Sequence, residues 1–511
     1  MCGIFGSSSV DLELDPFLSL MSHRGPDAAG QLQTANWRIG HVRLAIVDLD
    51  PGANQPFEKD GSLLAFNGEI YNHLELRNKF FPGEEFRTSS DTELALSMLN
   101  RFGLSALNYF NGMFSLAWID SAGVLRLARD RFGVKPLYYS WIQNSFFFSS
   151  EIKPLLSAQK TREFDQSSVL DFLNHGRADF DGRSGYRGIY CLLPGHWMQP
   201  SQSAAKTSYD RWYRGEDYLP QQRRPDEDIV SEAERLLKDA IRLRCRADVP
   251  VCITLSGGVD STTLYVLMKS MGIHVQPFVY RKKTIGDADA SAAIELAAEY
   301  GDEPVVVEQS LELSELFEST MQHLEFPVWS FSSLGYFETY SAIAAEGFKV
   351  VIEGHGADEL LGGYPYMLDA ALVEIFREGR GRELRTLLQV AAESRSSGWA
   401  NLGNFPRRIQ IATRLLKVLT SSGSGGFFHT LDSAFHTDIL PTVLRVFDRL
   451  TMANSIESRM PYLDFRFVEY ARRLQRKSLF SQIGSKAGLR EILMRHGAQA
   501  IAANKFKSGF S

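Results

Sequence analysis

The sequence predicts two domains of different fold class: an α+β domain with antiparallel sheets, then a doubly wound α/β domain with a parallel sheet. Three observations lead to this prediction. The chain has 511 residues, enough for two large domains or for three of about 150 residues. Short apolar or alternating runs dominate its first half. After residue 226, helical patterns alternate with apolar strands. We expect the domains at residues 1–210 and 211–511.

The first half contains short strands that are separated by turn sequences such as Asp50-Pro51-Gly52. The predicted strands occupy residues 37–49, 63–71, 113–119 and 124–129. Helical periodicity predicts helices at residues 91–102, 104–110 and 167–174. The polar, proline-flanked residues 199–224 are predicted to be the linker between the domains.

The second half alternates between helices and strands. The predicted strands are residues 249–255, 275–280, 304–307 and 349–352. The predicted helices are residues 228–244, 260–271, 289–300 and 335–346. After residue 367 the chain is helical and less regular, with a flexible loop expected at the sequence SSGSGG, residues 421–426.

Composition excludes several classes of protein. The formal net charge is −6, which argues against general nucleic-acid binding but not against a local phosphate pocket. Four cysteines without a CxxC pair make a disulfide scaffold or a structural zinc site unexpected. The N-terminus lacks the pattern of a signal peptide, and no apolar run reaches about 18 residues. We therefore expect a cytoplasmic protein with reduced thiols and no contact with membranes.

A glycine turn in the second half has the features of a phosphate loop. An apolar strand ends at Ser256-Gly257-Gly258, and a helix follows directly. The glycines let backbone N–H groups approach an anion, and the helix N-terminus adds a favourable dipole. Ser256 and Ser261 supply hydroxyl groups, and Asp260 supplies a carboxylate of the kind that binds magnesium. An ordinary turn between a strand and a helix is the alternative.

Cys2 follows the initiator methionine. Removal of Met1 would put a thiol and a free α-amine on one residue, and this amine could serve as the base for its own nucleophile. Asn67-Gly68 follows an apolar run, and its amide and backbone N–H could form an oxyanion hole. The alternatives are a small buried cysteine near the terminus and a hairpin turn at Asn67-Gly68.

Several motifs of the first half together resemble the class II, or N-terminal nucleophile, glutamine amidotransferases. They are MCGIFG at the N-terminus, HRGPD at residues 23–27, RLAI at 43–46, NGEIYN at 67–72, SDTE at 90–93 and DRFGVKPLY at 130–138. The resemblance implies stacked antiparallel sheets between layers of helices.

Motifs of the second half resemble the N-type ATP pyrophosphatases and, joined to the first half, the architecture of glutamine-dependent asparagine synthetase. They are SGGVDST at residues 256–262, GHGADELLGGY at 354–364, DRLTMA at 448–453, IESRMPYLD at 456–464, KAGLR at 486–490 and KSGF at 507–510. The resemblance is weakest over residues 367–435. It implies that a helical C-terminal part follows the parallel sheet.

For the first domain, the resemblance implies that Cys2 attacks the side-chain amide of glutamine and releases ammonia. Asn67 and Gly68 would hold the oxyanion. Arg43 would pair with the α-carboxylate of glutamine, which suits the fork of a guanidinium group. The α-amino end would be held by Glu69 and Asp91. Without the resemblance, the simpler interpretation is that Glu69 and Asp91 are surface charges or cap a helix.

For the second domain, the resemblance implies adenylation of a carboxylate by ATP. Leu255 and Val279 would touch adenine. The residues implied for the phosphates are Ser256, Gly257, Gly258, Asp260, Ser261 and Gly354. Asp260 and Asp358 would hold Mg²⁺, and Lys486 would stabilise the phosphoryl charge, although a lone lysine can equally be a solvated one. Ammonia would then attack the acyl-adenylate and give an amide and AMP.

The sequence departs from the family at the acceptor. The family stretch usually reads Ser-Gly-Glu-Gly, whereas here it reads Glu353-Gly354-His355-Gly356. His355 replaces a glutamate in a position suited to a general base, and histidine can accept a proton near neutral pH. Either aspartate remains the acceptor, or the acceptor is another carboxylate, such as a sugar uronic acid, a biosynthetic intermediate or a peptide.

The expected partners are glutamine, ATP and a carboxylate acceptor, and the resemblance is compatible with a homodimer. Two other functions fit the sequence less well. A cyclase that joins the adenylate to an internal amine, as in lasso-peptide biosynthesis, would need no glutaminase, so the intact Cys2, Arg43 and Asn67-Gly68 argue against it. A non-catalytic scaffold or sensor is disfavoured by the retained Asp260, Asp358, Lys486 and Cys2.

Overall fold

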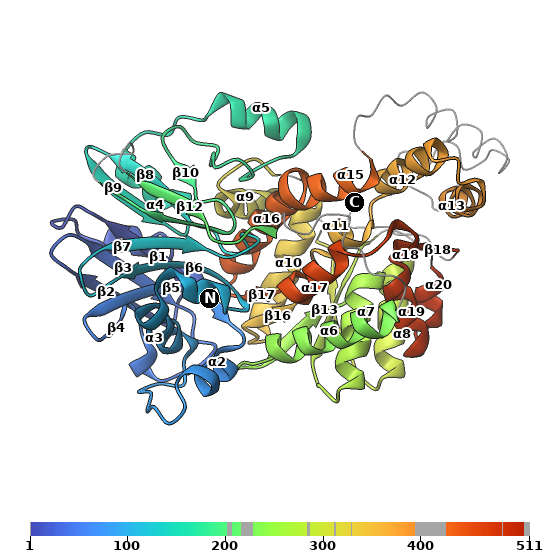
Figure 1. Ribbon diagram of the computed structural model, residues 1–511, viewed down its shortest axis with the longest axis horizontal. Coiled ribbons are helices and arrows are strands. Elements are labelled where there is room, and N and C mark those ends of the chain that lie inside the picture. Colours follow the sequence, from blue (N-terminus) through green and yellow to red (C-terminus); the bar gives the residue numbers. More distant parts are fainter. Residues whose placement is uncertain are drawn as a thin grey trace.

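The computed structural model describes residues 2–201, 207–215, 228–283, 287–310, 313–328, 330–393, 426–482 and 484–504. Two halves of the chain lie side by side (Figure 1). We call them the N-terminal domain, up to residue 213, and the C-terminal domain, from residue 228. The first contains antiparallel sheets and the second a parallel sheet, so the predicted fold class is confirmed.

The N-terminal domain contains two antiparallel six-stranded sheets. Across the first sheet the order is β10 (Tyr190–Cys191), β8 (Tyr138–Ile142), β9 (Ser145–Ser149), β1 (Cys2–Ser7), β3 (Arg38–Arg43) and β2 (Ala28–Gln33). Across the second it is β12 (Ser208–Arg211), β11 (His196–Gln199), β7 (Leu125–Arg129), β6 (Gly112–Ile119), β5 (Ser62–Ile70) and β4 (Phe57–Lys59). Strand β2 forms one edge of the first sheet, and its residues are alternately half-buried and exposed.

The two sheets stack through a core of alternating apolar side chains. Their facing residues include Ile4, Leu63, Ala65, Ala117 and Phe148. The outer faces are covered by helices: α1 (Asp15–Ser19) and α4 (Ile152–Gln159) on the first sheet, and α2 (His73–Phe80) and α3 (Asp91–Phe102) on the second. Strand alternation puts one set of side chains into the central core and the other under the helices. The implied stack of two sheets between helices is therefore confirmed.

The C-terminal domain is built on a parallel sheet of five strands. Their order is β15 (Val305–Glu308), β14 (Gln276–Arg281), β13 (Val251–Thr254), β16 (Val350–Ile352) and β17 (Glu457–Arg459). The chain winds from β13 outward to β15 and then returns to place β16 on the other side of β13. This reversal of direction makes the gap between the carboxyl ends of β13 and β16 the expected ligand site of a doubly wound fold.

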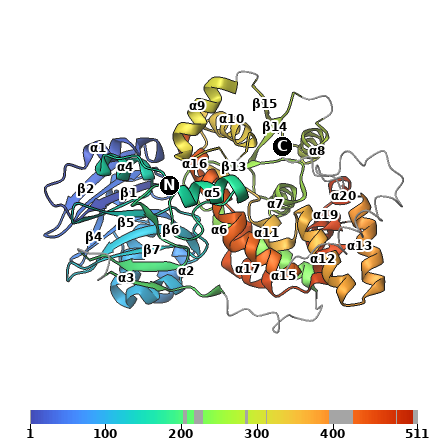
Figure 2. The same cartoon turned by 90° about the horizontal axis from the view of Figure 1, so that it is seen from above.

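Helices cover both faces of this sheet (Figure 2). One group comprises α9 (Leu313–Leu324), α10 (Ser332–Ala345) and α16 (Leu440–Ala453), and the other α6 (Ile229–Arg244), α7 (Val259–Ser270) and α19 (Ala487–Arg495). The remaining elements are α5 (Gln166–His175), α8 (Ala288–Glu299), α11 (Ala357–Leu361), α12 (Pro365–Arg377), α13 (Gly381–Glu393), α15 (Phe427–Ser433), α17 (Phe465–Arg472), α18 (Arg476–Leu479), α20 (Gln499–Ala503) and the two short strands β18 (Phe480–Ser481) and β19 (Gly484–Ser485). Every helix of the described ranges is too short or too polar to cross a membrane.

The strand predicted at residues 37–49 is shorter than expected, since β3 ends at Arg43. Leu44 and Ile46 leave the sheet and join the apolar core of the C-terminal domain. The backbone oxygen of Ile46 also accepts a hydrogen bond from the N–H of Asp248. Docking between the domains therefore overrides the local strand pattern. The helix predicted at residues 104–110 is present as a 3-10 helix, Gly103–Asn108.

The linker predicted at residues 199–224 was wrong in its central part. Residues 208–211 form β12, which pairs with β11. Trp212 then stacks on Phe114 with 6.0 Å between the ring centroids, and its indole N–H donates to Arg129 O at 3.0 Å. Aromatic packing thus ties this polar stretch to the first domain. Residues 202–206 and 216–224 of the predicted linker lie outside the described residues, as do 421–425 of the predicted loop and the motif at 507–510.

Candidate functional site

A narrow pocket of about 30 Å³ in the N-terminal domain brings together most of the residues predicted to handle glutamine. We call it the Cys2 pocket. Its lining includes Cys2, Arg43, Gly68, Glu69, Asp91 and Glu457. The first five were predicted from sequence and come from β1, β3, β5 and α3.

Cys2 opens β1 in the middle of the first sheet and is 6% exposed. Its backbone nitrogen, which removal of Met1 would turn into the α-amine, lies 3.2 Å from Asn67 Oδ1. Arg24 Nε donates to the Cys2 carbonyl oxygen at 3.1 Å. Burial raises the pKa of the Cys2 thiol, so the thiol needs a base before it can act as a nucleophile. All four cysteines of the chain are free, as expected.

Asn67 and Gly68 lie inside β5, opposite Ser115 and Phe114 of β6, so the hairpin-turn alternative was wrong. The Asn67 amide nitrogen is 3.4 Å from the hydroxyl oxygens of Ser115 and Ser150. A Cβ atom at position 68 would overlap the carbonyl oxygen of Met113, so this close approach of two backbones requires glycine.

Arg43 has a charge that no carboxylate of the described residues pairs with, and Glu69 has an oxygen without a partner among them. The Arg43 guanidinium donates to neutral oxygens, including Asn54 Oδ1 at 2.7 Å and the Asp50 carbonyl at 3.0 Å. Within the described residues it forms no ion pair with a carboxylate. Glu69 Oε1 is buried and has no hydrogen-bond partner among those residues. Burial, followed by the charge of Asp91, holds the pKa of Glu69 well above its ordinary value.

Glu457 reaches the same pocket from the C-terminal domain and is paired with Arg459, and sequence reasoning assigned neither residue to this site. Arg459 Nε donates to Glu457 Oε1 at 2.5 Å, and Arg459 NH2 lies 3.5 Å from Glu69 Oε2. Both residues lie in the IESRMPYLD motif, which was the one available signal, but no local pattern says that β17 faces the other domain. Arg459 is fully buried and also donates to the carbonyl oxygens of Arg244 and Arg246 at 2.7 and 2.6 Å.

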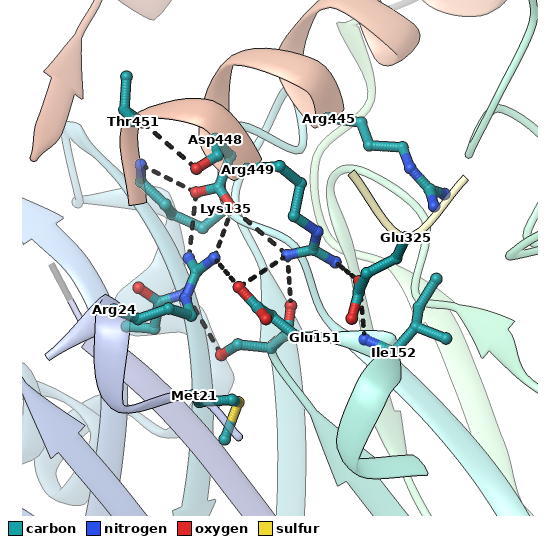
Figure 3. A network of polar contacts seen from close by, with 12 residues as sticks. Met21, Arg24, Lys135, Glu151, Ile152, Glu325, Arg445, Asp448, Arg449 and Thr451 are labelled. Carbon is teal, nitrogen blue, oxygen red and sulfur yellow. Dashed lines mark hydrogen bonds and ion pairs between the residues drawn. The ribbon is translucent and has the colours of Figure 1, made fainter. Parts of the chain in front are cut away.

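A buried network of charged side chains joins the domains next to Cys2 (Figure 3). Arg24 NH1 donates to Glu151 Oε1 at 2.9 Å and to Asp448 Oδ2 at 2.8 Å. On its far side, Arg449 NH2 lies 2.8 Å from Glu325 Oε2. Since Asp448 and Arg449 come from α16 and Arg24 also holds the Cys2 carbonyl, the network fixes Cys2 relative to the C-terminal domain.

The second site is a cavity of about 500 Å³ at the carboxyl ends of β13 and β16, where the sheet reverses its winding. We call it the large cavity. The predicted residues among its lining are Leu255, Ser256, Gly258, Asp260, Ser261, Gly354, His355 and Asp358. Val279 and Gly257 do not line it. Val279 is fully buried, whereas its neighbours Phe278 and Tyr280 face the cavity, as strand alternation requires.

The turn after β13 leads straight into α7, whose N-cap is Gly258. The hydroxyl groups of Ser256 and Ser261 are 3.0 Å apart, and the Ser256 N–H donates to Ser261 Oγ at 3.1 Å. Gly257 has φ +71°, and a Cβ there would overlap the carbonyl oxygen of Asp289. The turn therefore presents hydroxyl and backbone groups at the positive end of a twelve-residue helix, which suits a phosphate anion.

Lys486 lies between the two aspartates that were predicted to bind Mg²⁺. Its Nζ is 2.7 Å from both carboxylate oxygens of Asp260 and 2.5 Å from Asp358 Oδ1. Lys486 also has φ +59°, a conformation that side chains rarely adopt and that is often retained for function. Two carboxylates that converge on one cation are the hard oxygen donors that Mg²⁺ prefers. No group of three or more metal-binding side chains occurs among the described residues, so oxygens of a substrate would have to complete such a site.

His355 and Glu353 form a pair at the end of β16. His355 Nε2 lies 3.6 Å from Glu353 Oε2. Glu353 is 1% exposed, and its carboxylate accepts from the hydroxyl groups of Tyr340, at 2.6 Å, and Ser458. Burial alone would raise the pKa of Glu353, but the charge of His355 and these hydrogen bonds hold it below its ordinary value. Glu353 thus places a carboxylate directly beside the His355 ring.

Comparison with known proteins assigns both halves. The family model described as "Glutamine amidotransferase domain" matches residues 1–213, and the one described as "Asparagine synthase" matches residues 232–511. The amidase chyE of Penicillium rubens is 28% identical over 528 residues, covering 90% of this chain and 77% of that protein. Glutamine-hydrolyzing asparagine synthetase 1 of Bacillus subtilis is 28% identical over 566 residues, covering 100% and 87%. Asparagine synthetase B of Escherichia coli is 28% identical over 416 residues, covering 76% and 69%.

Proposed function

Since the chain belongs to the glutamine-hydrolysing asparagine synthetase family and is a glutamine-dependent carbon–nitrogen ligase, we propose the following division of labour. Glutamine is hydrolysed in the Cys2 pocket, and the ammonia reacts in the large cavity with an acyl-adenylate made from ATP and a carboxylate. The observation that carries this proposal is the grouping of Cys2, Arg43, Gly68, Glu69 and Asp91 around one pocket.

Arg43 and Glu69 hold the two ends of the glutamine amino acid group. Arg43 is fixed by neutral oxygens and forms no ion pair with a carboxylate of the described chain, so it can take the α-carboxylate. Glu69 Oε1, buried and without a hydrogen-bond partner in the same residues, can accept from the α-ammonium group, with Asp91 beside it. A polar atom that is buried without a partner is costly, and binding of glutamine would remove that cost.

The Cys2 sulfur attacks the side-chain amide carbon of glutamine. The α-amine freed by removal of Met1 takes the thiol proton and passes it to the leaving ammonia, and a glutamyl thioester remains. Water then hydrolyses the thioester to glutamate. Asn67 and Gly68 stabilise the oxyanion, and they lie beside Cys2 because Asn67 Oδ1 is 3.2 Å from the Cys2 nitrogen.

The turn at residues 256–258 and Ser261 hold the phosphates of ATP in the large cavity, with adenine near Leu255. An oxygen of the acceptor carboxylate attacks the α-phosphorus, and pyrophosphate leaves. Lys486 lies next to both aspartates, so it can turn from them to the phosphoryl charge that develops. Ammonia then attacks the acyl carbon, and AMP leaves.

Asp260 and Asp358 are the residues that would hold Mg²⁺, because both carboxylates already converge on the Lys486 ammonium group. When bound, the ion supplies positive charge against the phosphate oxygens.

The acceptor is a carboxylate, and aspartate is the acceptor of the family. A changed acceptor is the second candidate, and the specific observation that favours it is the pair of His355 and Glu353 at the acceptor position. In either case we assign to His355 the acceptance of the proton that the attacking ammonia loses, because its ring lines the cavity.

Two complementary variants test the division of labour. Cys2→Ala should abolish glutamine-dependent synthesis and keep synthesis from ammonium salts. Asp260→Ala should stop pyrophosphate release and keep hydrolysis of glutamine. Glu232→Ala, a surface carboxylate on α6, is the control and should change neither. Loss of both activities in Cys2→Ala, or unchanged synthesis in Asp260→Ala, would contradict the proposal. Aspartate is tested as acceptor by looking for asparagine and AMP.

A further inference from the structure

Aromatic rings line the end of the large cavity that faces His355. Tyr336, on α10, and Phe447, on α16, meet edge to face with their centroids 4.5 Å apart. The His355 ring lies 3.7 Å from the Phe447 ring, between centroids. All three side chains line the cavity. The position expected to receive the acceptor is therefore a slot walled by flat rings.

The apolar character continues beyond this slot. Val443 lies one helical turn before Phe447 on α16 and lines the same cavity. At the rim, Phe331 is 77% exposed and lies between Ser330 and Ser332, which both line the cavity.

The charges of the lining are poorly suited to aspartate. Six described lining residues are acidic: Asp260, Asp287, Asp289, Glu353, Asp358 and Glu359. Apart from His355, the cationic side chain among the described lining residues is Lys282, and the nearby Lys486 is already paired with Asp260 and Asp358. Aspartate has a second carboxylate that would need its own cation, because an unpaired buried charge is costly.

Glu353 does not supply a site for an amino group either. Its carboxylate is buried, and its oxygens are engaged by Tyr340, Ser458 and the nearby His355. It therefore supports the histidine ring instead of facing a substrate ammonium. Among the described residues, the slot itself is thus formed by a proton acceptor and ring surfaces.

We propose that the acceptor is a carboxylate borne on an aromatic ring, which packs against Tyr336 and Phe447 and points its carboxylate toward Ser256 and Ser261. This inference rests on the proposed function. The carboxylate oxygen bonds to the α-phosphorus of ATP as the bond to pyrophosphate breaks. Ammonia then bonds to the acyl carbon as the bond to AMP breaks, and the proton lost by nitrogen goes to His355.

The full-length protein is assayed with ATP, Mg²⁺ and ammonium chloride, so that the result does not depend on Cys2. The acceptors are benzoate, phenylacetate, aspartate and galacturonate, and pyrophosphate and the amide product are measured. At least one aryl acid should exceed aspartate in kcat/KM by at least about tenfold. Equal or better turnover of aspartate or galacturonate would overturn the aromatic acceptor and leave the proposed function intact. Absence of pyrophosphate release with all four acids would overturn both.

Variants test the slot itself. Phe447→Leu and Tyr336→Leu should each lower kcat/KM for the preferred aryl acid by about tenfold, because ring packing is lost. Phe376→Leu, which removes a 43% exposed ring on α12, is the matched control and should have no effect. Melting temperatures verify folding. If both slot variants kept wild-type kcat/KM, or lost activity only as far as they lost folded protein, the proposal would be wrong.

Discussion

Glu69 Oε2 in the N-terminal domain lies 3.5 Å from the guanidinium group of Arg459 in the C-terminal domain. Arg459 belongs to β17, whose side chains alternate between the two sites. Glu457 lines the Cys2 pocket and Arg459 pairs with it, whereas Ser458 between them donates to Glu353 at the large cavity. The wall of the Cys2 pocket is thus completed by the C-terminal domain, and a three-residue strand separates the two sites.

Arg459→Ala should strongly destabilise the protein. The guanidinium group is fully buried between Glu457, Glu69 and two backbone carbonyls, and its removal leaves buried carboxylates without compensation. The expected cost is about 3–5 kcal/mol, measured by chemical denaturation. Arg235→Ala is the control: its side chain is 64% exposed and its pair with Glu232 is worth less than about 1 kcal/mol. Equal losses in the two variants would show that the buried contact has no special role.

Glu69→Gln should weaken glutamine binding while synthesis from ammonium salts continues. The amide has the shape of the carboxyl group but cannot ionise beside the α-ammonium group. A charge-assisted hydrogen bond contributes about 1.5–3 kcal/mol, so KM for glutamine should rise by roughly tenfold or more. Steady-state kinetics with each nitrogen source measures this. An unchanged KM for glutamine would remove Glu69 from the binding site.

Gly363→Ala should impair synthesis without disturbing the glutaminase. A Cβ atom at position 363 would overlap Asp358 Oδ1 and Lys486 Cε, which forces apart the contact between these residues. Pyrophosphate release should fall by at least about tenfold, since a charged group near the phosphates is displaced. Gly381→Ala is the matched control, because a Cβ there meets nothing within 4 Å. A wild-type rate of synthesis in Gly363→Ala would show that the close packing of residue 363 against Asp358 and Lys486 is not needed for synthesis.

The buried imidazole of His41 should make the stability of the protein decrease in mild acid. It is fully buried in β3, and burial lowers its pKa to about 3. The His41 imidazole of the unfolded chain takes up a proton near pH 6.5, whereas that of the folded chain stays neutral down to about pH 3. The free energy of unfolding is therefore at its full value above about pH 6.5 and decreases as the pH falls toward 3. The loss is about 1.4 kcal/mol per pH unit in that window.

The measurement is the melting temperature of wild type and His41→Gln between pH 7 and pH 5. The glutamine variant should lose less stability than wild type over this interval, because it has no proton to take up. His274→Gln, at an exposed position, is the control and should follow wild type. Parallel curves for wild type and His41→Gln would contradict the assignment to His41.

Local sequence was sufficient where the structure depends on near neighbours. The helix predicted at residues 91–102 is α3 (Asp91–Phe102), and Ser90 Oγ caps it by accepting from the Glu93 N–H at 3.4 Å. The turn after β13 is equally local, since a strand, two glycines and a helix follow one another within a few residues. Capping and glycine conformations act within such short windows, so they can be recognised without the rest of the chain.

Other features depended on partners far away in the chain. The N-terminal strand β1 lies between β3 and β9, and sequence reasoning did not predict it as a strand. The predicted strand at residues 37–49 ends early because Leu44 and Ile46 pack on the other domain. The linker prediction failed at β12, where pairing with β11 and the packing of Trp212 outweigh the polar composition.

The sequence by itself determined the two fold classes and the family, and it predicted candidate residues for both sites, because the motifs are short and keep their order along the chain. Only the tertiary structure decided that Glu457 completes the Cys2 pocket, that Lys486 joins Asp260 to Asp358, and that Tyr336 and Phe447 wall the position of His355. These contacts join residues that are tens to hundreds of positions apart. They follow from sheet order and helix packing, which no local pattern of residues encodes.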